Sequence, residues 1–310
     1  MKKYVFQRIM YAMLTIFLLM FITFYMMRML PGDPFIGDKA MSDVVKAALT
    51  VKYGLDKPVF EQFIIYVTNC LQGDLGISIQ TNRSVTQIIT ESFPYSFDLG
   101  MRALIFALFG GVSLGSYAAL KRGKKGDTVA MLIAVFGVSV PSFVVAAILQ
   151  FLISKMGLRF IPTSGWTTEP SKWLPSLALG LGSLATISRL MRTSMLDVLA
   201  SDYIKTAKAK GLSSRTIIWR HAIRNGIMPV ITVLGPIAAS VLTGAFVVEK
   251  VFNIPGMGKF FVNSITQNDY TMISGSVLFY GAFLVIMTLL VDIAYGFIDP
   301  RVNIAGGKSK

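Results

Sequence analysis

Six long apolar windows without a charged residue limit this chain to one kind of fold. The hydrocarbon core of a bilayer takes about 20 helical residues, and the windows have roughly that length: Ile9–Met27, Ala103–Leu120, Thr128–Ser154, Trp173–Ser188, Asn225–Val248 and Tyr270–Val291. They are longer than the alternating strands of a membrane barrel, which span about 10 residues. With 54% hydrophobic and 15% charged residues, the chain also has too little polar surface for a soluble protein of this size. The sequence predicts an all-α integral membrane protein with six transmembrane helices.

The first window has one feature of a secretory signal peptide, because Lys2, Lys3 and Arg8 supply a basic stretch at its start. Its apolar run is too long for a signal peptide, however. The segment that follows it, "RMLPGDP" (Arg28–Pro34), contains no small-x-small cleavage site. We therefore expect an uncleaved membrane helix.

The Lys and Arg residues between the windows indicate the orientation of the chain, because cytoplasmic loops are enriched in them. Three precede the first window, four lie at positions 121–125, and eight lie between the fourth and fifth windows. The long segment Pro31–Asp98 instead carries five basic and eight acidic residues. We expect both termini in the cytoplasm. The net charge of +14 then follows from topology, which removes the main argument for nucleic-acid binding.

The segment Ser201–Asn225, between the fourth and fifth windows, is polar and strongly basic. Placing its six Lys and Arg residues at the centre of a bilayer would cost on the order of 15–20 kcal/mol. The segment therefore lies outside the membrane, on the cytoplasmic side by the orientation above.

The residue order within this segment predicts a helix, a tight turn and a second helix. Ser201 and Asp202 are typical of a helix start, and Gly211 is placed where a helix ends in a left-handed residue. Ser213 or Ser214 then caps the second helix, expected at 215–224. Such an object would dock in a groove of a partner protein. The alternative is a solvated basic connection that contacts only lipid headgroups.

Several stretches, taken together, resemble one family. "DYIKTAKAKGL" (Asp202–Leu212) is similar to the cytoplasmic coupling loop, often called the EAA loop, of permease subunits in binding-protein-dependent ABC importers. Other stretches resemble the B-type subunit of the peptide and nickel permease branch, and they cover nearly the whole chain: "LPGDP", "YGLDKP", "GDLGIS", "GVSVPSF", "LMRTSML", "RHAIRNGIMPVITVLG", "VVEKVFNIPGMG" and "DPRV".

The chain departs from the general importer pattern at the coupling loop. That pattern has Glu-Ala-Ala ahead of the glycine, whereas this chain has Lys205, Thr206 and Ala207. Pro229 also lies farther beyond Gly211 than the pattern expects. The peptide branch tolerates both differences. The departure removes the basis for a glutamate contact to an ATPase, and it leaves the role of the loop in place.

The resemblance implies a type I ABC importer permease fold and a non-catalytic subunit that forms half of a translocation pathway for peptides. Residues 1–98 would form an N-terminal transmembrane helix and a long extracytoplasmic loop region. Residues 99–310 would form a five-helix permease core with a cytoplasmic coupling loop at 197–228. The residues expected to contact an ATPase subunit are Asp202, Tyr203, Thr206, Ala207, Ala209, Lys210, Gly211 and Leu212.

By the same resemblance, the chain is a multi-pass protein of the bacterial cytoplasmic membrane, surrounded by membrane lipid. The expected partners are a second homologous permease in a heterodimer, two cytoplasmic ATPase subunits and an extracytoplasmic substrate-binding protein, with no nucleic acid. ATP and Mg are expected in the ATPase subunits. No cofactor and no metal are expected in this chain.

Two loops are candidates for an entry gate, because glycine, proline and aromatic residues gather in them. They are "PTSGW" (Pro162–Trp166) and "FNIPGMGKFF" (Phe252–Phe261), and Met257 and Phe260 are the gate residues that we single out. The same residue types also form ordinary turns. Asp292 is a carboxylate within the sixth window, and we expect it to pair with a basic side chain near a helix end.

The long segment Pro31–Asp98 is expected to help receive the substrate-binding protein, or alternatively to cover the first helices. Its stretch "LDKPVFEQFIIYVTNCLQ" (Leu55–Gln72) predicts an amphipathic helix, capped by Asp56, on the membrane surface or against the spans. Asp98 lies one turn before Arg102, and we expect these two residues to form an ion pair.

Catalytic groups are scarce in this sequence. One histidine, His221, and one cysteine, Cys70, cannot assemble a metal cluster. Two alternatives to a peptide importer remain. The same architecture would also serve for nickel or a metal-metallophore complex. A transporter driven by an ion gradient is the alternative of a different class, but it predicts binding groups within discontinuous spans and gives no role to the basic segment.

Overall fold

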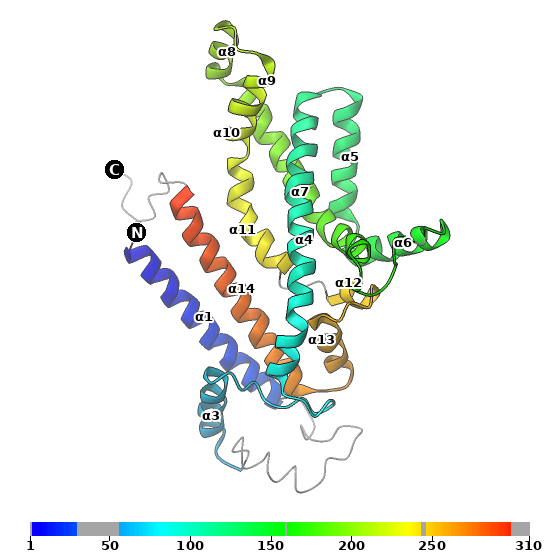
Figure 1. Cartoon of the computed structure of the whole chain (residues 1–310). Helices are drawn as coiled ribbons and strands as arrows, with labels where there is room; N and C mark the ends of the chain where they lie inside the picture. The colour runs from blue at the N-terminus through cyan, green and yellow to red at the C-terminus, as the bar shows by residue number, and fades with distance from the viewer. Residues whose placement is uncertain (1, 30–55, 159, 243–245, 299–310) are drawn as a thin grey trace. The chain divides into compact units, whose positions relative to one another are not determined.

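The structure is a computed structural model that describes residues 2–29, 56–158, 160–242 and 246–298 (Figure 1). Within these ranges the regular structure is helical, apart from one isolated bridge between Ile77 and Ser84. Four helices are long and apolar enough to cross a membrane: α1 (Lys2–Met29), α4 (Val85–Leu120), α7 (Trp173–Ala200) and α14 (Tyr270–Ile298). Two bent helix pairs bring the number of spans to six if each pair is one span. The all-α membrane fold is confirmed.

The helices divide into two compact units. One unit contains residues 1–95 and 256–310, and the other contains residues 96–255. We call them the terminal unit and the central unit. We predicted a division at residue 98, which would set apart only the N-terminal part of the chain. That division differs from these two compact units, and it stays a prediction.

In the terminal unit, α1 and α14 lie side by side. The helix α3 (Val59–Leu71) packs on α1 through a cluster of aromatic rings centred on the buried side chain of Phe63. The ring centroid of Phe63 lies 5.3 Å from that of Phe24 and 5.6 Å from that of Phe21. The expected outer helix therefore exists and contacts a span.

The start of α3 differs from the prediction. Pro58, and not Asp56, occupies the N-cap position, and no side chain caps the helix. The side-chain nitrogen Nε2 of Gln62 instead donates to the backbone carbonyl oxygen of Lys57, at 2.6 Å. Because proline lacks an N–H group and has a fixed φ, it is well suited to a helix start without a capping side chain.

A buried carboxylate holds the loop before α4 in the terminal unit. Asp269, which is 2% exposed, accepts hydrogen bonds from the hydroxyl of Ser78 at 2.5 Å and from the backbone N–H of Ile79 at 3.2 Å. It also accepts a bond from the N–H of Met272 in the first turn of α14, at 3.1 Å. One side chain thus caps α14 and ties it to a loop about 190 positions earlier in the chain. The sequence analysis did not find this contact.

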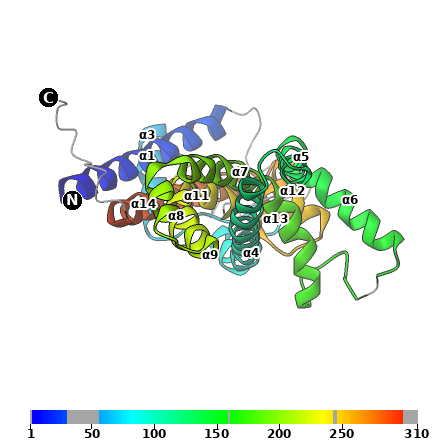
Figure 2. The ribbon, with the colours of Figure 1, turned by 90° about the horizontal axis from the view of Figure 1, so that it is seen from above.

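The third window is not the single straight helix that we expected. It contains α5 (Lys125–Ser139) and α6 (Ser142–Lys155), which are bent by 111°, and Figure 2 shows α6 running away from α5. The break lies at Val140, which has the extended angles φ −97° and ψ 125°, and at Pro141. Proline lacks the N–H of a helix interior and excludes the residue before it from the helical region.

The fifth window is also broken. A helical segment from Ser214 to Gly226 precedes α11 (Met228–Leu242), and the two are bent by 47°. The described part of α11 ends at Leu242, and α12 (Phe246–Val251) begins after residues 243–245, which lie outside the described residues. The bend after Gly226 shows that the predicted span Asn225–Val248 is broken near its start.

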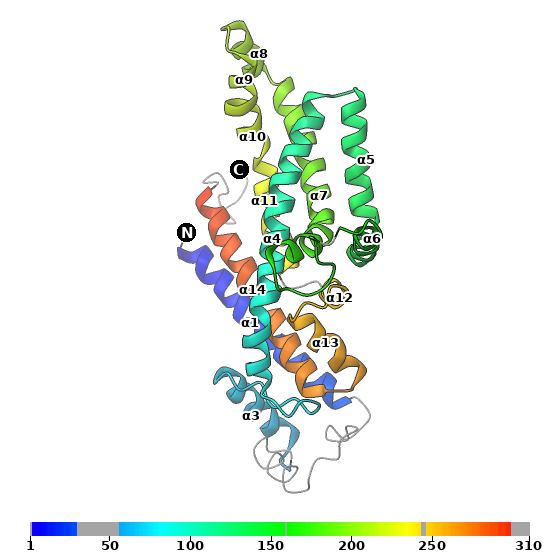
Figure 3. The same ribbon diagram turned by 45° about the vertical axis from the view of Figure 1, so that its right-hand side comes forward.

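The helix α7 forms the centre of the central unit, with α5, α6 and α11 packed against it (Figure 3). Its side chains Ile187, Met191 and Met195 are fully buried. A Cβ atom on Gly180 of α7 would lie 2.6 Å from the carbonyl oxygen of Ala103 in α4. The small residues in these spans thus allow two helix backbones to approach closely.

Candidate functional site

The basic segment between α7 and α11 folds as a compact helical hairpin at one end of the central unit (Figure 1). Its first helix is α8 (Asp202–Ala209), and only Ser201 separates it from α7. The chain then turns at Gly211, which has a φ of +78°. The N–H of Gly211 donates to the carbonyl oxygen of Lys208 at 3.0 Å. The predicted left-handed end of the first helix is confirmed. We call residues 201–225 the coupling hairpin.

The helix starts in the coupling hairpin follow the prediction only in part. Ser213 caps the second helix, because its hydroxyl oxygen accepts the N–H of Thr216 at 3.2 Å. Ser201 occupies the N-cap position of α8, but its hydroxyl donates to the carbonyl oxygen of Val198 at 2.6 Å and makes no capping bond. The first helix thus starts where the sequence predicts, without the expected capping hydrogen bond.

The second helix of the hairpin contains a π-helical segment that sequence reasoning missed. After α9 (Ser214–Thr216), the π-helix η2 (Ile217–Ile223) leads into α10 (Arg224–Gly226). A π-helix has a wider hydrogen-bond repeat than an α-helix, and such segments often occur at functional sites. No residue type specifies it, so the sequence contains no clear signal for it.

A small apolar core holds the two helices of the hairpin together. Ile204, Ala207 and Ile217 form a buried cluster, with Val198 and Leu212 packed against it. Ala207 is only 9% exposed, so its side chain faces the hairpin interior. The side chain of this expected contact residue therefore supports the hairpin from within.

The outer surface of the hairpin carries most of the other expected contact residues. Asp202, Tyr203, Thr206, Ala209, Lys210 and Gly211 are exposed, and Leu212 is half-buried. The amide nitrogen of Asn225 donates to the phenol oxygen of Tyr203 at 3.3 Å, which fixes the ring against the second helix. Trp219 is 66% exposed. A tryptophan in a polar, basic stretch is the signal that would have identified this residue as part of the surface.

An ion pair joins α7 to the first turn of α5. The guanidinium group of Arg192 donates to both carboxylate oxygens of Asp127, at 2.6 and 2.8 Å. The N–H of Gly123 also donates to this carboxylate, at 3.1 Å. Asp127 is 6% exposed. Because the pair is bidentate and largely buried, it fixes α5 against the half of α7 that leads into the coupling hairpin.

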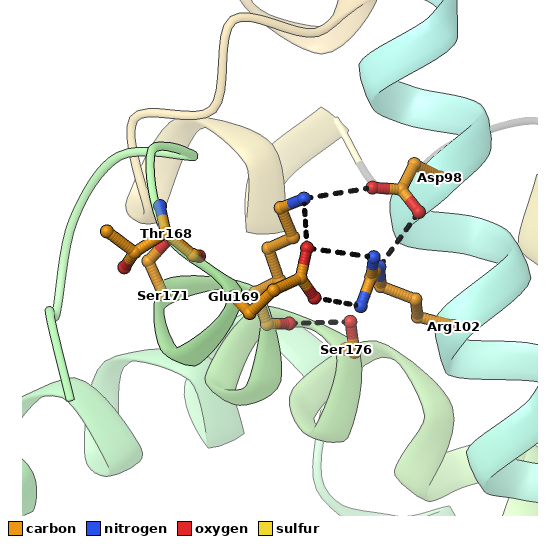
Figure 4. A network of polar contacts seen from close by, with 7 residues as sticks. Asp98, Arg102, Thr168, Glu169, Ser171 and Ser176 are labelled. Atoms are coloured by element: carbon orange, nitrogen blue, oxygen red, sulfur yellow. Dashed lines mark hydrogen bonds and ion pairs between the residues drawn. The ribbon is translucent and has the colours of Figure 1, made fainter.

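A second charged cluster lies at the start of α7 (Figure 4). Arg102 donates to Asp98 at 2.8 Å, as the sequence predicts, and also to Glu169 at 2.8 Å. Lys172 donates to Glu169 at 2.8 Å. Its ammonium group also lies 5.6 Å from the ring centroid of Trp166. The predicted ion pair is therefore one part of a larger network that holds the loop before α7.

The residues expected to form a gate are mostly buried. Met257, at the start of α13 (Met257–Thr266), is fully buried, and Phe260 is partly buried. In the central unit, the N–H of Gly165 donates to the carbonyl oxygen of Phe252 at 2.7 Å. The loop at 162–166 therefore contacts the start of the other expected gate loop. The side chain of Asp292 lies outside the described residues, so its predicted pairing stays a prediction.

Comparison with known proteins gives strong matches over the whole chain. The dipeptide transport system permease protein DppB of Bacillus subtilis is 45% identical over 307 residues, covering 98% of this chain and 99% of the relative. The oligopeptide transport system permease protein OppB of Haemophilus influenzae is 39% identical over 306 residues, covering 98% of this chain and 100% of the relative.

Solved structures with the same fold include an inward-facing methionine ABC transporter, MetNI, with a TM-score of 0.55 and 16% identity, covering 70% of this chain and 97% of that chain. An amino acid ABC transporter matches with a TM-score of 0.50 and 16% identity, covering 70% of this chain and 95% of that chain. The model of the binding-protein-dependent transport system inner membrane components matches residues 111–304, and the model of their N-terminal part matches residues 1–100. This chain therefore belongs to the family of binding-protein-dependent transport system inner membrane components.

Proposed function

We propose that this chain carries peptides across the bacterial cytoplasmic membrane as one of two permease subunits, and that the coupling hairpin connects it to an ATPase. The observation that carries the coupling role is the hairpin itself. It is basic and has its own apolar core, it protrudes from the end of α7, and the described residues of the central unit leave its outer surface uncovered. Peptide cargo is supported by the similarity to dipeptide and oligopeptide permeases.

The geometry of the hairpin explains how it would transmit a movement. The core of Ile204, Ala207 and Ile217 makes its two helices one body. Only Ser201 lies between this body and α7. A displacement of the hairpin would therefore reach α7 directly, and then α5 through the Asp127–Arg192 ion pair. The work comes from the different fit of the hairpin to two states of the ATPase.

The surface chemistry of the hairpin specifies the kind of cleft that would receive it. The hairpin carries six Lys and Arg residues but only one acidic residue, Asp202. The carboxylate of Asp202 already pairs with Lys205 at 2.8 Å. The exposed rings of Tyr203 and Trp219 supply apolar area. The receiving cleft would thus be acidic and would contain an apolar pocket, since complementary charge favours correct docking.

The remaining assignments follow from this role. The two ATPase subunits would bind ATP and Mg, and this chain would hold neither. A second permease would complete the translocation pathway, and an extracytoplasmic binding protein would deliver the peptide. The hairpin and both termini would face the cytoplasm. Residues 1–98 would form the extra N-terminal region, and residues 99–310, with the coupling loop at 197–228, would form the permease core.

Reconstitution tests this proposal. The chain, a second permease and two ATPase subunits from the same organism would be placed in proteoliposomes with the binding protein. We expect ATP-dependent uptake of a labelled di- or oligopeptide. Negative charge introduced at two exposed positions of the hairpin, with T206E and K210E, should abolish uptake while the protein inserts normally. Uptake that needs an ion gradient and no ATP would contradict the proposal.

A further inference from the structure

One side chain of α6 connects the two loops at the end of the central unit opposite to the coupling hairpin. The amide nitrogen of Gln150 donates to the carbonyl oxygen of Thr163 at 2.7 Å and to that of Val251 at 3.4 Å. Thr163 belongs to the loop before α7, and Val251 is the last residue of α12. These carbonyl groups are 88 positions apart in sequence. Both N–H groups of a single amide are thus used to join distant segments.

Further contacts join the same segments next to Gln150. The N–H of Gly165 donates to the carbonyl oxygen of Phe252 at 2.7 Å, and the hydroxyl of Ser164 lies 3.4 Å from the same oxygen. Trp166 and Phe252 belong to one buried apolar cluster. The loop is therefore held both by polar bonds and by apolar contacts. We call Gln150, Thr163, Val251 and the Gly165–Phe252 bond the latch.

The position of the latch relates it to transport. It lies at the start of α7, while the coupling hairpin lies at the end of α7, 28 residues away. At a rise of about 1.5 Å per residue, these sites are roughly 40 Å apart, which is enough to reach both faces of a bilayer. The helix that carries Gln150 is attached through the break at Val140 and Pro141, so α6 is able to change its direction without unfolding α5.

We propose that Gln150 is a positioning residue that holds the two loops closed over the outer end of the transport pathway until the ATPase subunits drive them apart. This inference rests on the proposed function. The bonds of Gln150 add to the apolar packing of Trp166 and Phe252, which they orient. A conformational change exchanges such hydrogen bonds at modest cost.

Two substitutions at Gln150 test the latch. Gln150→Met keeps the length of the side chain and removes both donors. Gln150→Glu is nearly the same shape but turns a carboxylate toward two carbonyl oxygens, so its effect should be larger. Ser154→Ala, one turn farther along α6 at an exposed position, is the matched control. Loss of the two bonds should shift the balance from closed to open loops about tenfold, which corresponds to about 1.4 kcal/mol.

The first measurement is hydrogen exchange on the purified complex. We expect the peptide that contains Gly165 to exchange about tenfold faster in both Gln150 variants, with unchanged exchange in the middle of α7 and in the Ser154→Ala control. Unchanged exchange around Gly165 would overturn the inference. Faster exchange throughout the central unit would do so as well, because Gln150 would then support general stability and not the loops.

The second measurement separates positioning from structure. In proteoliposomes without binding protein, the Gln150 variants should raise the basal ATPase rate severalfold. With the peptide-loaded binding protein present, they should lower the number of peptides transported per ATP. Their maximal ATPase rate should match that of the native complex. Faster exchange at Gly165 with native basal ATPase and native coupling would overturn the inference. If the native complex moves no peptide while exchange and basal ATPase change as expected, the peptide assignment fails and the latch stands.

Discussion

The turn at Gly211 offers the sharpest test of the coupling hairpin. Its φ is +78°, and a Cβ atom placed on it would have no heavy atom within 4 Å. A substitution here therefore introduces backbone strain without a steric clash. A residue other than glycine pays about 1–2 kcal/mol in the left-handed region, and a β-branched residue lies at the upper end. For Gly211→Val, about 2 kcal/mol corresponds to a roughly 30-fold loss in the population of the turn.

The expected result is a protein that inserts in the membrane and no longer couples. When the turn opens, Leu212 leaves the cluster around Ile204 and Ala207, and the two helices no longer move as one body. ATP-driven peptide uptake in proteoliposomes should fall at least tenfold. The ATPase rate should lose its response to the peptide-loaded binding protein. Quantification of the membrane-inserted protein separates this effect from poor expression.

Two variants make this experiment specific. Gly211→Asn should restore most of the uptake, because asparagine tolerates the left-handed region better than other residues. Gly157→Val is the matched control. Gly157 has a φ of +66° and no heavy atom within 4 Å of an added Cβ atom, but it lies just after the end of α6. Its substitution should leave coupling largely intact. Normal uptake by Gly211→Val, or an equal loss of uptake in both valine variants, would refute the proposed role of this turn.

Other contacts lead to measurable effects. Arg192→Met leaves the buried carboxylate of Asp127 without its bidentate partner and should lower the free energy of unfolding in detergent by about 2–3 kcal/mol. The double variant Arg192→Met/Asp127→Leu should lose less of this free energy. An equal or greater loss in the double variant would contradict the paired role. Asp269→Ala removes the acceptor for several N–H and O–H groups and should cost about 2–3 kcal/mol, seen as a lower midpoint of thermal unfolding, whereas an unchanged midpoint would contradict its role as a clamp. Burial raises the pKa of the Cys70 thiol to about 11, so its alkylation at pH 7.5 should be about 100-fold slower than that of an exposed thiol. The alkylation rate should still rise between pH 9 and pH 10, and a plateau below pH 9.5 would exclude the raised pKa.

The sequence predicts best those features that depend on composition over a long stretch. A span of about 20 apolar residues is recognisable because each residue adds to the free energy of transfer. The coupling hairpin is recognisable for a similar reason, since its charges exclude it from the bilayer and Gly211 marks the turn. The burial of Ala207 in the hairpin was not predicted, because this residue was expected on the surface that contacts an ATPase. Ile204 and Ala207 are three positions apart on one helix face, which is the local signal for it.

The features that were missed depend on single residues or on distant contacts. Pro141 breaks the third window. Counting apolar residues does not reveal this break, because proline counts as apolar although it lacks the N–H group that a helix needs. The clamp by Asp269 and the bridge by Gln150 join segments that are far apart in sequence, and no local pattern indicates such partners. The π-helix in the hairpin has no characteristic composition. These details became visible only once the packing was known.

The most direct test of the account is whether an ATPase binds to the outer surface of the coupling hairpin. The tagged chain would be purified in mild detergent from its own membranes, alongside the T206E/K210E variant, which changes only exposed residues of the hairpin. We predict that a second permease and an ATPase accompany the native chain, and that the variant retains the permease and loses the ATPase. Equal amounts of ATPase with both chains, or none with the native chain, would contradict the claim that this hairpin connects the permease to ATP hydrolysis.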